Sequence, residues 1–199
     1  MNDETKNLKS RIRSRVRAEL DRISPDERWR ASKQASELLQ LQSIWKNATS
    51  VLFYAPLPDE LDLSPLWKEA ISQGKRLALP RFHREAWEYV ACQLADPTRR
   101  LAIGRFGLLE PPADSPRVAL KQLDLVLVPG VAFDLSGRRL GRGRGYFDRL
   151  LAKVSGTKCG VAFEQQIQAE LPLEPHDVPV DCILTPERWF CCGQRPAMK

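Results

Sequence analysis

The chain has 199 residues, of which 43% are hydrophobic and 28% charged, which is the composition of a globular protein long enough to bury a full core. Its net charge of +6 favours anionic ligands, whereas five cysteines without a C-x-x-C pair and only two histidines argue against a disulfide framework and a zinc site. The N-terminal residues are charged, and no apolar run reaches the ~20 residues of a membrane span, so we expect a cytoplasmic protein with no membrane partner.

Two helices are predicted at the start of the chain. In residues 4–22, apolar side chains recur every four positions from Leu8 to Leu20, which gives one buried stripe on an otherwise basic helix. A second helix is predicted over residues 24–41. It begins with Ser-Pro-Asp-Glu, which supplies an N-cap, a proline for the first turn and the glutamate of a capping box.

The rest of the chain alternates apolar strands with helices. The expected strands cover residues 50–55, 76–80, 87–92, 124–129, 159–163 and 181–185, and the expected helices 64–73 and 146–154. This alternation predicts a three-layer α/β/α fold with a mostly parallel, Rossmann-like open sheet. We expect one domain over residues 1–199, with a turn-rich loop at 104–112 and a poorly structured tail at 190–199.

The most informative stretch is the loop that follows the strand at 124–129. Four glycines and four arginines crowd into residues 137–145, directly before the helix that begins at Tyr146. Glycines let backbone N–H groups approach an anion, and arginines donate paired hydrogen bonds to phosphate oxygens. Ligands of parallel sheets bind beyond the carboxyl ends of the strands, where this loop lies. The pattern favours phosphate binding, but it matches neither the P-loop nor the dinucleotide fingerprint, and a solvated turn is the alternative.

Two aspartates are candidates for binding Mg²⁺. Asp148 lies in the first turn of the helix after the glycine loop, and Asp181 opens the strand at 181–185. Carboxylates from distant segments can hold this ion beside phosphates, directly or through water. Taken singly, each has a simpler explanation: Asp148 interacts favourably with the helix dipole, and Asp181 is a turn or cap residue.

Other polar and aromatic residues could contact the rest of a ligand. Lys9 and Arg13 share one face of the first helix, where an anion between them would relieve their repulsion; the alternative is a solvated basic face. Glu60 could accept a hydrogen bond from a ligand amide or ring N–H, or belong to an exposed turn. His176 could donate to phosphate or be structural. Tyr146 could pack against a planar heterocycle.

The chain closely resembles the 5-formyltetrahydrofolate cyclo-ligases, also called methenyltetrahydrofolate synthetases. The resemblance is strongest at Pro-Gly-Val-Ala-Phe-Asp (129–134) and at Arg-Leu-Gly-Arg-Gly-Arg-Gly-Tyr-Phe-Asp (139–148). Four further segments agree in the same order and with similar spacing, at residues 9–13, 59–60, 160–163 and 171–181. The chain departs from the family's pattern at Phe147, where many members have a second tyrosine, at Arg144, where glycine or lysine is common, and at 54–60, which is one residue longer than in some members.

The resemblance implies ATP- and Mg²⁺-dependent cyclisation of 5-formyltetrahydrofolate to 5,10-methenyltetrahydrofolate, through phosphorylation of the formyl oxygen, with release of ADP and phosphate. It implies that ATP is bound by Lys9, Arg13, Arg139, Leu140, Gly141, Arg142, Gly143, Arg144, Gly145, Tyr146 and Phe147. The folate would be bound by Tyr54, Glu60, Arg142, Gly143, Arg144, Gly145 and Tyr146. Arg142, Arg144 and Tyr146 would be catalytic, and Asp148 and Asp181 would bind Mg²⁺. The expected partners are therefore ATP and a reduced folate, with or without a polyglutamate tail, and we expect a monomer that binds no nucleic acid.

Three other functions compete with this interpretation. A nucleic-acid-binding module would account for the net charge of +6 and the arginine-rich first helix, although no RRM, KH or helix-turn-helix pattern is present. A related enzyme could use the same ATP site for another formyl or amide substrate. A non-catalytic folate-binding protein would bind 5-formyltetrahydrofolate without any need for Asp148 or Asp181.

Overall fold

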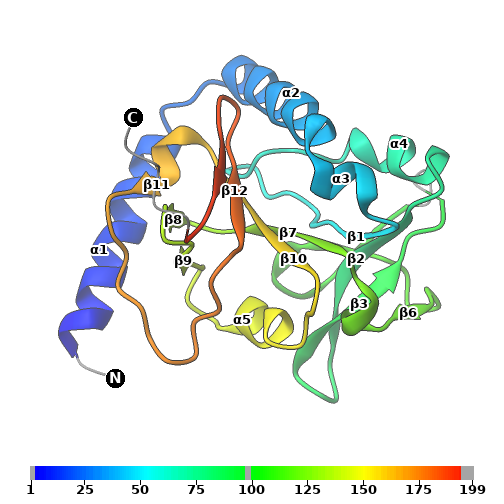
Figure 1. Ribbon diagram of the computed structural model, residues 1–199. Coiled ribbons are helices and arrows are strands. Elements are labelled where there is room, and N and C mark those ends of the chain that lie inside the picture. Colours follow the sequence, from blue (N-terminus) through cyan, green and yellow to red (C-terminus); the bar gives the residue numbers. More distant parts are fainter. Residues whose placement is uncertain (1–2, 97–99, 194–199) are drawn as a thin grey trace.

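The computed structural model describes residues 3–96 and 100–193 and is built around one large sheet (Figure 1). Its five central strands are all parallel, in the order β12 (Cys182–Leu184), β10 (Thr157–Val161), β7 (Leu125–Pro129), β1 (Ser50–Leu52) and β2 (Arg76–His83). Antiparallel strands extend both edges, namely β13 (Trp189–Cys191) beside β12, and β3 (Glu88–Gln93) followed by β6 (Arg117–Val118) beside β2. The expected mostly parallel sheet is confirmed.

Helices cover both faces of this sheet, as Figure 1 shows. One core takes its helical residues from α1 (Asp3–Leu20), α2 (Pro25–Leu41), α3 (Ser43–Asn47) and α4 (Leu66–Ser72), and the core on the opposite face is covered by α5 (Tyr146–Leu151). Along β7, Leu125 and Leu127 belong to the first core and Val126 and Val128 to the second, which explains its uninterrupted apolar sequence. The three-layer prediction is confirmed. No helix in the described ranges has the length and apolar character needed to cross a membrane.

Three segments differ from their predicted structure. The poorly structured tail was expected at 190–199, but residues 190 and 191 belong to β13 and pair with β12. Residues 194–199 lie outside the described part of the chain. The expected loop at 104–112 contains part of a small ribbon, formed by β4 (Ala102–Ile103) and β5 (Leu109–Glu110). The predicted strand ends at Pro80, but β2 continues to His83. The proline is tolerated because the pairing of β2 with β1 ends at Ala78, so its missing N–H costs no hydrogen bond to β1.

A second, small sheet carries the glycine-rich loop. It consists of β11 (Ile167–Gln168), β8 (Ala132–Asp134) and β9 (Arg139–Leu140), and the only other regular elements of the described chain are three short 3₁₀ turns, η1 (Arg105–Gly107), η2 (Leu120–Gln122) and η3 (Glu164–Gln166). Asp134 is 1% exposed and organises the β8–β9 turn. Its carboxylate accepts hydrogen bonds at 2.9–3.0 Å from the backbone N–H groups of Ser136, Arg138 and Leu171. This buried acceptor fixes the direction in which residues 139–145 leave the hairpin.

Asp124 joins the beginnings of β1 and β7, at the amino ends of the parallel strands. Its Oδ2 accepts four hydrogen bonds, from the backbone N–H groups and the hydroxyls of Thr49 and Ser50, at 2.7–2.9 Å. The hydrogen bonds from Thr49, together with those from Ser50, hold the pKa of this carboxyl below its ordinary value.

We predict that Asp124→Asn lowers the free energy of unfolding by roughly 1–3 kcal/mol at pH 7, because a charged acceptor of several hydrogen bonds is lost. A carboxyl with a depressed folded-state pKa stabilises the fold above its unfolded pKa, and this contribution disappears as pH falls below ~4. Denaturant unfolding at pH 7 and pH 3 should therefore show a difference between wild type and variant that shrinks in acid. The exposed carboxylate Glu37 supplies the control, Glu37→Gln, with little change at either pH.

Candidate functional site

A cavity of about 1080 Å³ opens beyond the carboxyl ends of the parallel strands. Pro129, the last residue of β7, contributes to its lining together with Gly130, which follows β7, and Tyr54, which follows β1. The remaining lining comes mainly from α1, the glycine-rich loop, α5 and residues 174–178. The volume lies at the upper end of the ~300–1,000 Å³ found for small-molecule pockets, which leaves room for two ligands side by side.

The glycine-rich loop forms one wall of this cavity. Gly143 and Gly145 adopt φ angles of +95° and +64°, which side chains strongly disfavour, and Gly145 is the residue from which α5 begins. Arg13 of α1 docks on the loop, since its Nε donates a hydrogen bond of 2.8 Å to the carbonyl of Gly141. The structure therefore brings Arg13 and the glycine-rich loop together, as the sequence predicts.

Lys9 is held between two carboxylates from the far end of the chain. Its Nζ lies 2.6 Å from Oε2 of Glu174 and 2.6 Å from Oδ2 of Asp177, and the residue is 6% exposed. Burial acts to lower the pKa of Lys9, but the hydrogen bonds and charges of Asp177 and Glu174 outweigh it and raise the pKa. The ammonium is thus charged at neutral pH, and α1 is fixed against residues 174–177.

Two arginines of the glycine-rich loop are also paired. Arg139 is 6% exposed; it donates to Oδ1 of Asp148 at 2.6 Å and to the carbonyl of Pro129 at 3.2 Å. Arg142 contacts Oδ1 of Asp59 at 2.6 Å and Oε1 of Glu60 at 3.1 Å. Burial raises the pKa of Glu60, and the backbone N–H of Leu57 and the charge of Arg142 oppose this rise. The expected acidic segment and basic loop therefore meet across the cavity.

The cavity still has an excess of positive charge. Seven cations and four carboxylates are among its lining residues, so the lining carries a net charge of +3. The cations are Lys6, Lys9, Arg13, Arg139, Arg142, Arg144 and Arg149, and the carboxylates are Glu60, Asp148, Glu174 and Asp177. A multiply charged anion is the ligand that such a surface favours.

Aromatic side chains form another wall of the cavity. Tyr146 packs edge-to-face against Phe82, with ring centroids 5.4 Å apart, and against Tyr89, at 5.9 Å. The lining near these rings includes the apolar residues Pro80, Leu108 and Leu109, and also Arg149, whose guanidinium lies 4.6 Å from the centroid of the Tyr146 ring. Tyr89 and Pro80 were not predicted as site residues, because β3 and the middle of β2 show only the apolar alternation that any buried strand shows.

Tyr54 lines the cavity as expected, but its hydroxyl is occupied. The Oη donates a hydrogen bond of 2.6 Å to the carbonyl of Leu61, and the residue is 5% exposed. Burial, followed by the charge of Glu60, raises the pKa of this phenol well above its ordinary value. Tyr54 therefore braces residues 54–61 and offers a ligand apolar surface rather than a hydrogen bond.

The structure does not bring Asp148 and Asp181, the two expected metal ligands, together at the cavity. Asp148 lines the cavity, whereas Asp181 does not. Asp181 precedes β12 and accepts a 2.7 Å hydrogen bond from the N–H of Lys158, which lies opposite Val126 near the start of β7. Three strand residues, or ~10 Å, separate that level from Pro129 at the cavity. The reason is topological: Asp181 lies at the amino end of β12, whereas the cavity lies beyond the carboxyl ends of the parallel strands.

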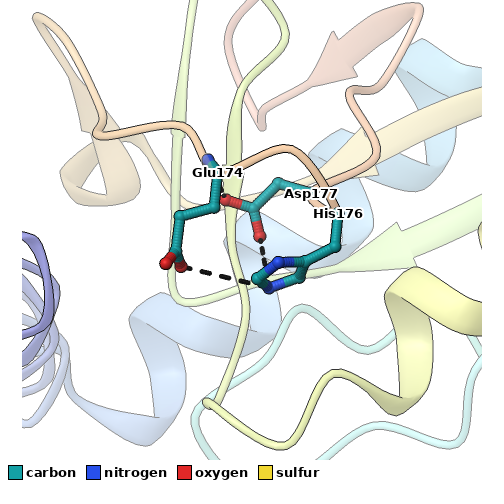
Figure 2. Close-up of side chains that lie close together, drawn as sticks. All are labelled: Glu174, His176 and Asp177. Atoms are coloured by element: carbon teal, nitrogen blue, oxygen red, sulfur yellow. Dashed lines mark hydrogen bonds and ion pairs between the residues drawn. The ribbon is translucent and has the colours of Figure 1, made fainter. Parts of the chain in front are cut away.

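Besides Asp148 and Glu60, the carboxylates that border the cavity are Glu174 and Asp177. One ligand atom from each of Glu174, His176 and Asp177 lies within 4.8 Å of the others, and these side chains converge in Figure 2. His176 is largely exposed, with Nε2 3.9 Å from Glu174 and 3.7 Å from Asp177. The segment 171–181 was identified by its sequence, but no role was predicted for either carboxylate; the signal available was their acidic character in a basic protein.

Comparisons with known proteins agree with this geometry. The model of the 5-formyltetrahydrofolate cyclo-ligase family matches residues 5–186. The chain belongs to this family. It is 31% identical to the 5-formyltetrahydrofolate cyclo-ligase of Escherichia coli K12, over 89% of the chain and 97% of the relative, and 26% identical to the mouse enzyme of the same name, over 92% and 94%. Among solved structures, the NMR structure of Aquifex aeolicus 5,10-methenyltetrahydrofolate synthetase is 36% identical, with a TM-score of 0.85 and 96% of each chain covered.

We predict that Asp148→Asn weakens binding of MgATP about tenfold or more, the factor that ~1.4 kcal/mol produces, because a carboxylate expected to hold the Mg²⁺ that accompanies ATP is lost. Asp181→Asn should leave the affinity within about threefold of wild type, because Asp181 lies outside the cavity. Calorimetric titration with MgATP measures both, and thermal unfolding checks that each variant is folded. A large loss in Asp181→Asn with Asp148→Asn unaffected would contradict this assignment.

Proposed function

We propose that this protein catalyses the ATP-dependent cyclisation of 5-formyltetrahydrofolate to 5,10-methenyltetrahydrofolate, with release of ADP and phosphate. The observation that carries the proposal is one cavity with two chemically different walls, a cationic one and an aromatic one, that meet at residues 142–146. The family membership supports the same reaction. A phosphate donor and a planar reduced folate would thereby bind next to each other at the loop that touches both walls.

The cationic wall suits ATP. Lys9 and Arg13 project from α1, and the loop from Arg139 to Phe147 faces them across the cavity, so both predicted ATP-binding segments border one space. In the free protein, carboxylates neutralise Lys9, Arg139 and Arg142. The triphosphate would compete for these cations, and the excess positive charge of the cavity favours it.

The aromatic wall suits the reduced folate. Tyr146 lies at the junction of the two walls, and Glu60 lies opposite it on the residues that follow β1. The buried carboxylate of Glu60 already accepts the N–H of Leu57 at 3.0 Å, and Arg142 holds its other oxygen. Glu60 would therefore meet a ligand N–H with an oriented acceptor, while Tyr54 and Tyr146 would contact the ring faces or edges.

The reaction chemistry needs positioning and charge neutralisation more than a protein nucleophile. A formamide carbon is a poor electrophile, so the formyl oxygen first attacks the γ-phosphorus of ATP and ADP leaves. The 10-nitrogen then attacks the activated carbon and loses its proton, and phosphate departs with the former formyl oxygen. Arg142 and Arg144, which line the cavity where the two walls meet, would stabilise the phosphoryl group during its transfer.

Mg²⁺ would enter this site with ATP and neutralise phosphate charge. Mg²⁺ binds carboxylate oxygens and retains waters, and Asp148, Glu174 and Asp177 are the carboxylates on the cationic side of the cavity. Each already stabilises a cation, Arg139 or Lys9. When phosphates take over these cations, the carboxylates become available to the ion, directly or through water.

The same geometry disfavours the competing functions. Against a nucleic-acid module, Lys9 and Arg13 of α1 are engaged with other residues of the cavity, although Lys6, Arg11, Arg15 and Arg17 of the same helix are exposed. We also propose that the protein acts in the cytoplasm as a monomer, as the sequence predicts. A folate-binding protein without activity would have no use for the cationic wall.

The test is to incubate the purified protein with 5-formyltetrahydrofolate and MgATP and follow the near-ultraviolet absorbance of the methenyl product. Absorbance growth that requires both ATP and Mg²⁺ supports the proposal. ATP binding without product would indicate a relative that uses another formyl or amide substrate, and ADP release with such compounds would identify it. Folate binding without ATP binding would indicate a non-catalytic binder.

We predict that Arg142→Ala lowers kcat about 100-fold or more and raises the folate KM only a few-fold, because the guanidinium acts mainly on charge that develops during phosphoryl transfer. Steady-state kinetics with each substrate varied in turn measures both quantities. Arg188→Ala is the matched control, because that guanidinium forms an exposed ion pair with Glu164 outside the cavity. Equal losses in turnover and folate affinity would argue against a role in the transition state.

A further inference from the structure

Tyr89 carries a buried hydroxyl that makes no hydrogen bond in the described structure. The residue lies in the middle of β3 and is 5% exposed, and its ring lines the cavity. No described group accepts from or donates to its Oη. A buried polar group without a partner destabilises the folded protein, and such groups are rare enough in native structures to require an explanation.

The ring that carries this hydroxyl is held firmly in place. It packs edge-to-face against Phe82, with centroids 5.5 Å apart, and against Tyr146 at 5.9 Å, while Phe82 and Tyr146 also contact each other at 5.4 Å. Three mutually perpendicular rings leave little freedom for reorientation. The hydroxyl therefore has a fixed position, as a binding group should.

The position of Tyr89 selects the kind of ligand. Its neighbours in the cavity lining include the apolar residues Pro80, on the adjacent strand, Leu108 and Leu109, and the charges of Glu110, Arg105 and Arg144 also act on its hydroxyl. A flat heterocycle would bury its faces against the apolar residues. Burial, and then the charge of Glu110, raises the pKa of Tyr89 to about 12, so the phenol stays neutral and can donate or accept.

We propose that the Tyr89 hydroxyl is a binding group for the reduced folate and forms a hydrogen bond with a polar atom of its bicyclic ring. The inference rests on the proposed function, since it takes 5-formyltetrahydrofolate as the ligand. It adds a specificity-determining contact on β3, far in sequence from the glycine-rich loop and from the residues after β1. The unsatisfied hydroxyl of the free protein is satisfied only when the folate is bound.

The decisive variant is Tyr89→Phe, which removes the hydroxyl and keeps the ring. The affinity for 5-formyltetrahydrofolate should fall about tenfold, as expected for one buried hydrogen bond, while the affinity for MgATP stays unchanged. The unfolding midpoint should stay the same or rise, because the free protein loses a group that had no partner. Loss of binding without loss of stability is a result that a structural role would not produce.

Tyr54→Phe is the matched control for stability. Tyr54 is also 5% exposed, but its hydroxyl donates to the carbonyl of Leu61 at 2.6 Å. The same chemical change should therefore lower its unfolding midpoint by about 2–4 °C, the shift that ~1 kcal/mol produces in a protein of this size. The two variants together separate a hydroxyl used by the fold from one used by the ligand.

The experiment combines equilibrium titration with 5-formyltetrahydrofolate, titration with MgATP, and thermal unfolding. The proposal is overturned if Tyr89→Phe binds the folate as wild type does, if both ligands weaken equally, or if the variant loses stability as Tyr54→Phe does. Wild type that binds the folate but forms no methenyl product would refute the proposed reaction and leave the Tyr89 titration decisive. Wild type that does not bind the folate would refute both.

Discussion

The contact between Lys9 and the carboxylates of Glu174 and Asp177 is the interaction on which the rest of the site depends. It fixes α1 against a segment from the other end of the chain, and the cavity exists because these two pieces stand on either side of the glycine-rich loop. The physical constraint behind it is general for anion sites. Cations gathered to bind phosphate repel one another when the phosphate is absent, so the free protein needs internal counter-charges. Asp148 and Glu60 meet the same need for Arg139 and Arg142.

Much of the architecture could be predicted because its signals are local. The capping box at Ser24 and Glu27 forms as the sequence indicates, and the uninterrupted apolar runs became buried parallel strands. The glycine-rich loop was identifiable because few other roles explain four glycines among four arginines. Short elements were missed: β13 and the β4–β5 ribbon are two or three residues long, and their stability comes from tertiary pairing rather than from propensity.

The site residues that prediction missed are those whose meaning depends on three-dimensional neighbours. Asp181 and Asp177 lie four residues apart in one acidic segment, yet only Asp177 reaches the cavity, because Asp181 is already at the opening of β12. No pattern within the segment distinguishes them. Tyr89 was missed for the same reason, because the sequence of a strand does not show whether a tyrosine hydroxyl has a hydrogen-bond partner in the fold. The glycine-rich loop could be identified from the sequence, but the topology of the fold determines which carboxylates and aromatic rings lie beside it.

The long separation between Lys9 and Asp177, 168 positions along the chain, also has a consequence for how the protein is made. During synthesis, α1 emerges from the ribosome before residues 174–177, and it exposes its apolar stripe and its cations until they follow. The central strands can pair during this interval, but the cavity cannot close until residues 174–177 have been synthesised. Ligands therefore cannot assist the early steps of folding, and the sheet has to assemble on its own packing before any substrate is recognised.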